Sequence, residues 1–211
     1  MKTLITALKI FLFFTILTGI LYPLTITGIA QVLFPDKANG SLIVNDNKIV
    51  GSELIGQQFD SVIYFTARPS AISYNPLPSG GSNYGLTNTR LKTLVEERKT
   101  RFLDFNRLDS LTIIPSEMLF ASASGLDPHI SQKAALLQVE RIVKARKFNS
   151  LQEQNLIQSI KDITEKPQFS VLGEERVNIL KLNIEIDEIG KSNTNKKKLS
   201  VNLHSNTGDD Q

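Results

Sequence analysis

The segment from Ser122 to Ser131 (SASGLDPHIS) places serine, aspartate and histidine within ten positions. These are the side-chain types of a hydrolytic triad, in which a base is oriented toward its nucleophile by a third group that usually comes from a distant part of the chain. No GxSxG nucleophile elbow accompanies Asp127 and His129. Because Asp127-Pro128 is also typical of a turn before a helix, we expect a turn here and assign no catalytic residue.

A second set of candidate residues could bind phosphate. The run 79–83 (SGGSN) contains Ser79, Gly80 and Gly81, whose backbone N–H groups could face an anion. A Walker-type site needs GxxxxGK[ST], which the sequence lacks, so a structural turn is the favoured interpretation. Gln138 and Arg141 lie about one helical turn apart, a spacing typical of a hydrogen-bonded pair on a helix surface.

Charge and composition exclude several kinds of site. Lys2 and Lys9 are the only charges before Asp36, and without these two lysines the chain has 22 basic against 21 acidic side chains. Such a balance offers no basic face for nucleic acid. With no cysteine and two histidines, the chain has neither a disulfide framework nor a thiolate metal site, and we assign no metal ligands.

Residues 10–34 carry no charge and are long enough to cross a bilayer as a helix, which takes roughly 20 apolar residues. The alternative is a cleaved signal peptide ending at the small-x-small run 28–30, but signal h-regions span only about 7 to 15 residues. We therefore predict an uncleaved single-pass membrane protein. The basic residues precede the span, so the positive-inside rule places residues 1–9 in the cytoplasm and residues 36–211, which include the domain at 36–190, outside the plasma membrane.

Thr15, Gly19, Pro23 and Thr27 recur every fourth residue within the predicted span. Small residues at this spacing allow another helix to approach closely, which favours helix association in lipid. Pro23 also frees a backbone carbonyl, a cost best offset inside a helical bundle. The alternative is a lone tether with incidental small residues, and we favour a packed partner helix.

The remaining sequence predicts a small α+β domain. A hairpin is expected from Leu42–Val44 and Ile49–Val50, and a strand at 61–66. A loop as long as 68–87 is rare in a compact domain unless it is functional or disordered, so we expect one of the two. The expected helices cover 89–105, 131–147 with Ser131 as the cap, and a stretch that begins with a Ser150/Glu153 capping box. Residues 177–186 fit a strand or a helix, with strand favoured, and the polar tail 191–211 is expected to be disordered.

Several of these segments together resemble the KdpC family, the C subunit of the Kdp potassium-transporting P-type ATPase. The matching runs are YPLTITGIAQVLFP (22–35), NGSLIV (39–44), VGSELIGQQF (50–59), YFTARPSAISYN (64–75), SGGSNYG (79–85), SASGLDPHIS (122–131), AALLQVERIVKAR (134–146) and RVNILKLNIEID (176–187). The runs at 64–75 and 122–131 are the most specific. The tail from Lys191 is longer and more basic than the family pattern.

The resemblance implies a small single-span subunit that accompanies a channel-like potassium-translocating subunit and an ATP-hydrolysing P-type subunit. The P-type phosphorylation motif DKTG is absent here, so this chain is not the hydrolysing subunit. The resemblance implies a role in assembly of the complex. It also implies a catalytic-chaperone role, in which Gln138 and the SGGSN run help to bind ATP and raise the nucleotide affinity of the hydrolysing subunit. This second role conflicts with the predicted topology, because an external domain does not meet cytoplasmic ATP.

Overall fold

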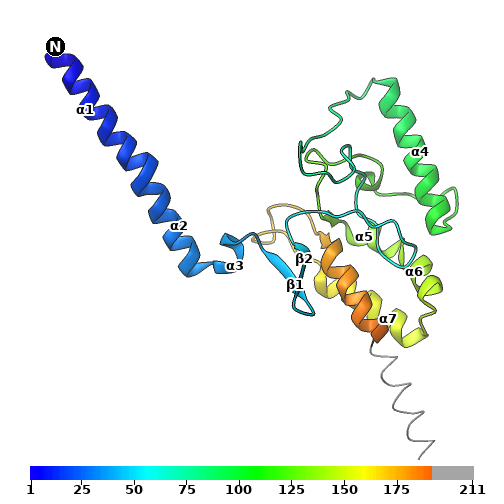
Figure 1. The fold of residues 1–211 in the computed structure, drawn as a ribbon. Helices are drawn as coiled ribbons and strands as arrows, with labels where there is room; N and C mark the ends of the chain where they lie inside the picture. Colours follow the sequence, from blue (N-terminus) through cyan, green and yellow to red (C-terminus); the bar gives the residue numbers. More distant parts are fainter. Residues whose placement is uncertain (192–211) are drawn as a thin grey trace, which may run out of the picture. The chain divides into compact units, whose positions relative to one another are not determined.

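The computed structural model describes residues 1–191 (Figure 1). The chain divides into two compact units, residues Met1–Leu54 and the residues from Ile55 onward. The predicted disordered tail lies outside the described residues, apart from Lys191.

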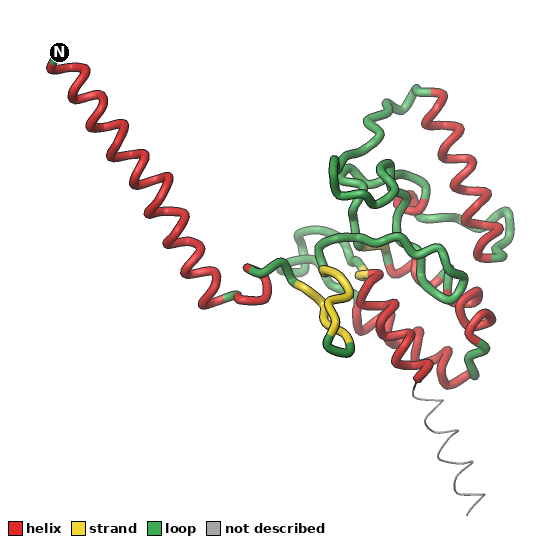
Figure 2. Tube along the Cα trace, viewed as in Figure 1, coloured by secondary structure: helices red, strands yellow, loops and turns green. Residues whose placement is uncertain are grey.

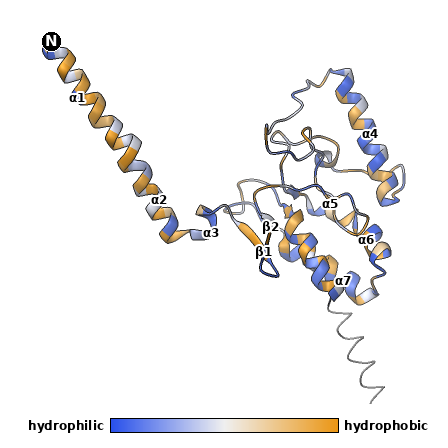
Figure 3. Cartoon of the chain, viewed as in Figure 1, coloured by the Kyte–Doolittle hydropathy of each residue, from blue (hydrophilic) through white to orange (hydrophobic). Residues whose placement is uncertain are grey.

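The first unit begins with a long helix made of α1 (Lys2–Ile16), the π-helical turn η1 (Leu17–Leu21) and α2 (Tyr22–Leu33). Most of the helix carries hydrophobic or neutral hydropathy colours (Figure 3), and none of its residues is buried. Within residues 1–191 it is the one helix long and apolar enough to cross a membrane. Its length and composition therefore agree with the predicted span.

The π turn lies just before Pro23. Proline has no N–H to donate to the carbonyl four residues earlier, so a regular α-helical ladder is interrupted at this point. In the structure the N–H of Tyr22 donates to the carbonyl of Leu17, five residues back. Single π turns inside α-helices often occur at functional sites.

After the short helix α3 (Pro35–Ala38), strands β1 (Leu42–Asn45) and β2 (Lys48–Ser52) pair antiparallel. Asp46 and Asn47 form the two-residue turn with φ of 47° and 60°, as a type I′ hairpin requires. The predicted hairpin is confirmed.

The second unit is a small α+β domain in which long loops connect the helices (Figure 2). Its elements are α4 (Thr89–Asn106), η2 (Ser116–Met118), β3 (His129–Ile130), α5 (Gln132–Leu136), α6 (Val139–Arg146), α7 (Ser150–Ile163), β4 (Val177–Asn178) and a helical stretch at 179–191. Strands β3 and β4 pair antiparallel, and the core forms where α5, α6, α7 and the helix 179–191 pack together.

Two helix predictions hold with adjusted bounds. The helix predicted at 89–105 is α4. The helix predicted at 131–147 is split into α5 and α6, because the N–H of Gln138 bonds the carbonyl of Ala135 in a tighter turn. The Oγ of Ser131 accepts from the N–H of Ala134 at 3.1 Å, which confirms the predicted cap.

The capping box predicted at Ser150/Glu153 is wrong by one position. Asn149, not Ser150, is the N-cap: its side chain accepts from the N–H of Gln152, and the Gln152 side chain accepts from the N–H of Asn149. Asparagine is an equally good cap and lies one residue earlier, so the box is shifted by one position from Ser150/Glu153.

The strand favoured at 177–186 is wrong beyond its first two residues. From Ile179 the chain is helical, and Asn178 caps the helix by accepting from the N–H of Lys181 at 3.1 Å. Ile179, Leu182 and Ile186 are buried at helical spacing. The spacing of Leu and Ile fits both the two-residue period of a strand and the 3.6-residue period of a helix. The cap and the packing against the core favour the helix.

The strand predicted at 61–66 is also wrong. This segment belongs to neither of the two sheets within residues 1–191. Phe65 is nevertheless completely buried, as a strand residue facing the core would be. The reason is that side chains, rather than a second strand, bind the backbone of this segment.

Candidate functional site

The most extensive polar arrangement in the described domain surrounds residues 62–66. We name it the 62–66 clamp, and it consists of four side chains that bind the backbone of this segment: Gln138, Arg141, Arg146 and Asn183. Gln138 lies at the turn between α5 and α6, the two arginines on α6, and Asn183 on the helix 179–191.

Two amide side chains of the clamp act as a neighbouring strand would. The Oδ1 of Asn183 accepts from the N–H of Phe65 at 2.8 Å, and its Nδ2 donates to the Phe65 carbonyl at 3.0 Å. Gln138 repeats the pattern on Thr66, with Oε1 accepting at 2.8 Å and Nε2 donating at 3.2 Å. Buried backbone groups need partners, and these amides supply them where no strand is adjacent.

Arg141 is the charged member at the centre of the clamp and is 4% exposed. Its guanidinium donates to the carbonyls of Val62 and Tyr64 and, through Nε, to Oδ1 of Asn106 at 2.9 Å. It also lies 4.4 Å from the ring centroid of Phe105. Burial lowers the pKa of Arg141 to about 10, so the side chain stays charged at neutral pH. Carbonyl dipoles and an aromatic face, rather than a carboxylate, compensate this charge.

Gln138 is completely buried. Besides its bonds to the Thr66 backbone, Oε1 accepts from the Thr66 hydroxyl and from Nη2 of Arg141, both at 3.0 Å, and Nε2 lies 3.4 Å from the carbonyl of Ala134. The predicted hydrogen-bonded pair with Arg141 is present, but inside the domain rather than on a helix surface. Each polar atom of the Gln138 side chain is bonded within the chain.

Arg146 continues the clamp toward the surface. Its Nε donates to the carbonyl of Ile63 at 2.7 Å, and its Nη2 pairs with Oδ1 of Asp187 at 2.7 Å. The Tyr64 ring lies under the guanidinium, and the Tyr64 hydroxyl donates to the other oxygen of Asp187 at 3.0 Å. Burial, and then the hydrogen bond to Asp187, raise the pKa of Tyr64.

The SGGSN run packs against the loop 122–125. The N–H of Gly80 donates to the carbonyl of Ser124 at 3.1 Å, while Ser79 is exposed. A Cβ at Gly81 would lie 3.1 Å from the carbonyl oxygen of Ala123. This contact gives the glycines of the run a packing role and uses one of the donors considered for phosphate.

The partner loop depends on Gly125, which has φ of +71°. A Cβ there would lie 2.5 Å from Cγ1 of Ile72 and 2.9 Å from the carbonyl oxygen of Gly80. The two loops therefore approach so closely that only glycine fits at position 125. Gly80 bonds Ser124 across the two loops. Gln138 instead bonds Thr66, Ala134 and Arg141, so it shares no hydrogen-bond partner with Gly80.

Asp127 joins the long loop to the start of β3. Its Oδ2 pairs with Nη1 of Arg68 at 2.7 Å, and its Oδ1 accepts from the backbone N–H of His129 at 3.0 Å and faces Nδ1 of His129 at 3.4 Å. Burial opposes ionisation of Asp127, but the hydrogen bonds from His129 and Arg68 outweigh it and lower the pKa to about 2. Burial, and then the charge of Asp127, raise the pKa of Tyr74 to about 12.

The serines near His129 have structural positions. Ser131 caps α5, and Ser122 is buried, with its carbonyl accepting from the N–H of Gly125. Among residues 1–191 no hydrogen bond joins a serine hydroxyl to His129, and no three His, Asp or Glu side chains gather as metal ligands would. The segment 122–131 thus comprises the turn before β3, the strand β3 and the cap of α5.

The four predicted helix-packing residues lie on the long helix of the first unit, and all are exposed. The Thr15 hydroxyl donates to the carbonyl of Phe11 at 2.8 Å, and, apart from the backbone of its own helix, no described residue lies within 4 Å of a Cβ built at Gly19. Pro23 follows the π turn, and Thr27 lies one turn later. This face is open to another helix.

Sequence analysis identified two of the four side chains of the clamp, Gln138 and Arg141. Asn183 and Arg146 were not singled out, because their partners lie 118 and 83 residues away along the chain. The one local signal was the polar Asn183 at a core position of an otherwise apolar helical pattern, where a buried amide must find partners.

Comparison with known proteins assigns this fold to a family. Residues 4–188 match the KdpC family, described as K+-transporting ATPase, c chain. The potassium-transporting ATPase KdpC subunit of Dechloromonas aromatica is 46% identical over 195 residues, covering 90% of this chain and 100% of the relative. The KdpC subunit of Mycobacterium tuberculosis is 42% identical over 190 residues, covering 89% and 99%. That of Caldanaerobacter subterraneus is 44% identical over 185 residues, covering 87% and 94%.

The match spans both units, and the identity to the relatives exceeds 40% over nearly their full length. The chain belongs to the KdpC family, the c chain of K+-transporting ATPases.

Proposed function

We propose that this chain is the accessory, non-hydrolysing subunit of an ATP-driven potassium importer. Its long helix spans the plasma membrane and packs against a channel-like, potassium-translocating subunit, and the complex also contains an ATP-hydrolysing P-type subunit. Its role is to assemble and stabilise the complex and thereby to support the hydrolysing subunit. Family membership supports the place in the complex.

The observation that carries this proposal is the helix Lys2–Leu33, whose apolar side chains are exposed along its whole length. Exposing such apolar surface to water costs about 25 cal/mol of free energy per Å². A bilayer removes that cost, and the helix satisfies its backbone internally as hydrocarbon requires. The open face at Gly19 supports association with another membrane helix.

Assembly is tested with a matched pair of glycine substitutions. A Cβ at either Gly19 or Gly28 would meet nothing within 4 Å, but only Gly19 belongs to the four-residue series that includes Pro23 and Thr27. We expect Gly19→Leu to reduce co-purification of the potassium-translocating subunit strongly and Gly28→Leu to reduce it little. Equal recovery of the complex with both variants would refute packing through this face.

We further propose that the N-terminus is cytoplasmic and residues 36–190 are extracytoplasmic, on the basis of Lys2 and Lys9 before the span. Protease added to spheroplasts should cleave the domain, and protease added to inverted vesicles should spare it. The reverse pattern would place the domain in the cytoplasm, where it could meet ATP.

The alternative function is a catalytic chaperone that binds ATP through Gln138, Ser79, Gly80 and Gly81. The burial of Gln138 and its full set of internal bonds favour a positioning role for this residue instead. In an assembled complex, Gln138→Ala should lower the yield of complex and leave the KM for ATP of the complex that does form unchanged. A several-fold rise in that KM, at normal yield, would favour the chaperone function.

A further inference from the structure

A cleft of about 560 Å³ lies between α4 and the segment 58–74 of the same domain. We name it the α4 cleft. Its volume falls in the range of small-molecule sites, about 300 to 1,000 Å³. Phe59, Phe102 and Phe105 contribute apolar lining, and polar side chains converge on it from both sides. The cleft therefore combines an apolar lining with a few polar groups, as ligand sites do.

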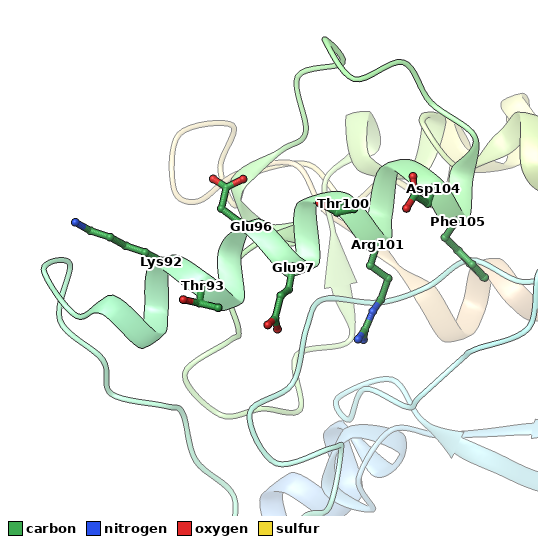
Figure 4. Close-up of a pocket in the computed structure, with 8 residues that line it drawn as sticks. All are labelled: Lys92, Thr93, Glu96, Glu97, Thr100, Arg101, Asp104 and Phe105. Atoms are coloured by element: carbon green, nitrogen blue, oxygen red, sulfur yellow. The ribbon is translucent and has the colours of Figure 1, made fainter.

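The charges in the α4 cleft do not cancel. Three arginines line it, Arg68, Arg98 and Arg101, against two acids, Glu97 and Asp60. Arg68 is also paired with Asp127, which lies outside the lining. Figure 4 draws an adjoining hollow along α4 that shares Glu97, Arg101 and Phe105 with the α4 cleft, and there Glu97 and Arg101 project from α4 toward the neighbouring loop. Asp60, the acid on the other wall, already accepts from the amide of Gln58 at 2.7 Å.

The two arginines differ in how they are held. One guanidinium nitrogen of Arg98 donates to the carbonyl of Leu119 at 2.9 Å, so this side chain is fixed by a neutral group. Arg101 makes no hydrogen bond or ion pair with the part of the chain that the structure describes. Burial, and then the charge of Arg101, lower the pKa of Arg98, and the charge of Glu97 opposes this shift only in part.

The opposite wall adds further donors. The Oγ of Ser70 accepts from the N–H groups of Ile72 and Tyr74, which leaves its own hydroxyl hydrogen available. Arg68 also lines the cleft, and its Nε is buried without a hydrogen-bond partner among the described atoms. Buried donors without partners are rare in native proteins and call for an explanation at the site where they occur.

We propose that the α4 cleft binds a phosphate group through Arg98 and Arg101, with Ser70 and Arg68 as further donors. A tetrahedral phosphate has several acceptor oxygens and suits donors that approach from two walls, whereas a planar carboxylate presents only two oxygens. The phosphate belongs either to a free inorganic ion or to the headgroup of an anionic phospholipid.

The test uses the full chain in dodecyl maltoside micelles, whose headgroup contains no phosphate. Hydrogen–deuterium exchange of the peptides covering 58–74 and 94–105 is followed in two series. One series titrates inorganic phosphate against chloride at equal ionic strength. The other adds phosphatidylglycerol, with neutral phosphatidylcholine as its reference.

Three substitutions on α4 separate a site from a general charge effect. Arg101→Gln removes the charged guanidinium donors of this residue. It should raise the Kd for phosphate about tenfold, the loss expected for one charge-assisted hydrogen bond. Lys92→Gln removes the same charge from the same helix, outside the α4 cleft, and should change the Kd less than about twofold. Glu97→Gln removes the competing acid and should tighten binding.

Saturable protection by phosphate that Arg101→Gln weakens supports a site for the free ion. Protection by phosphatidylglycerol alone, with the same dependence on Arg101, supports a site for a lipid headgroup. Absence of protection in both series overturns the proposal, and so do equal effects of Arg101→Gln and Lys92→Gln. Arg98 is left intact because its bond to Leu119 supports the fold.

Discussion

The long helix and the domain of this chain satisfy their polar groups in opposite ways. In the helix the hydroxyls of Thr15, Thr18 and Thr25 each donate to a carbonyl four residues earlier, and no residue is buried. In the domain, Gln138 and Asn183 bind backbone groups that lie 72 and 118 residues away along the chain. Local bonds suffice for the helix, while the domain depends on distant ones.

This difference shows where each region obtains its stability. The helix meets its backbone needs alone but leaves its apolar surface to be covered by lipid or by other helices. The domain covers its apolar core itself, and the 62–66 clamp compensates the buried backbone that no strand pairs. Substitutions in the domain should therefore alter folding, and substitutions in the helix should alter assembly.

Arg141→Met should have the largest effect on folding. Methionine keeps much of the side-chain volume but leaves the carbonyls of Val62 and Tyr64 and the amide of Asn106 without a donor. At about 1 to 3 kcal/mol for each unsatisfied buried group, with partial relaxation, we expect a loss of about 3 to 5 kcal/mol. Urea unfolding of the full chain in detergent measures this loss.

The control for Arg141→Met lies on the same helix. Lys144 is more than half exposed and, among residues 1–191, its side chain pairs only with Glu140, so Lys144→Met should cost no more than about 0.5 kcal/mol. If both substitutions cost the same, the clamp contributes nothing particular to stability and the contrast between the two regions is lost.

Gly125→Ala should be the next most damaging change. Alanine would be forced to φ of +71° with its Cβ 2.5 Å from Ile72, and strain together with overpacking should cost about 2 to 4 kcal/mol. At Gly80 a Cβ meets nothing within 4 Å, so Gly80→Ala should stay within about 0.5 kcal/mol of wild type. Thermal unfolding of both variants distinguishes them, and equal midpoints would contradict the close approach of the two loops.

The pH dependence of the stability that Asp127 contributes also tests the comparison between the helix and the domain, because its ion pair with Arg68 lies within the domain. Its pKa is about 2 in the folded chain against 3.8 for the free side chain, so its contribution is fully present above pH 3.8 and is lost as the pH falls toward 2. The shift corresponds to about 2 kcal/mol. Asp127→Asn should thus destabilise the domain by about 2 kcal/mol at pH 7 and by clearly less at pH 2.5. An equal loss in urea unfolding at the two pH values would contradict the lowered pKa.

The regions also differ in how well their sequences predict them. The long apolar helix, the hairpin and α4 could be predicted because their signals are local: an uncharged run, a polar two-residue turn and an amphipathic period. The segment 61–66 has the composition of a strand, and no local pattern reveals that side chains of α6 and the helix 179–191 replace its partner strand.

The candidate site was only partly predictable for the same reason. The spacing of Gln138 and Arg141 predicted their hydrogen bond, but not their burial or their common attachment to residues 62–66. Asn183 was missed because its segment fits two periods equally well. The α4 cleft needs both α4 and the segment 58–74, which only the folded domain brings together.

The smallest effect on folding is expected in the long helix. Leucine at Gly19 or at Gly28 finds open space, and no residue of this helix is buried, so Gly19→Leu and Gly28→Leu should each leave the unfolding of the domain within about 0.5 kcal/mol of wild type. Urea unfolding in detergent, followed through the exchange protection of α6 and α7, measures this. A loss above about 1 kcal/mol with Gly19→Leu would mean that the helix contributes to folding of the domain, and a weakened complex could then no longer be attributed to helix packing. An unchanged domain with a weakened complex would place the effect in the membrane.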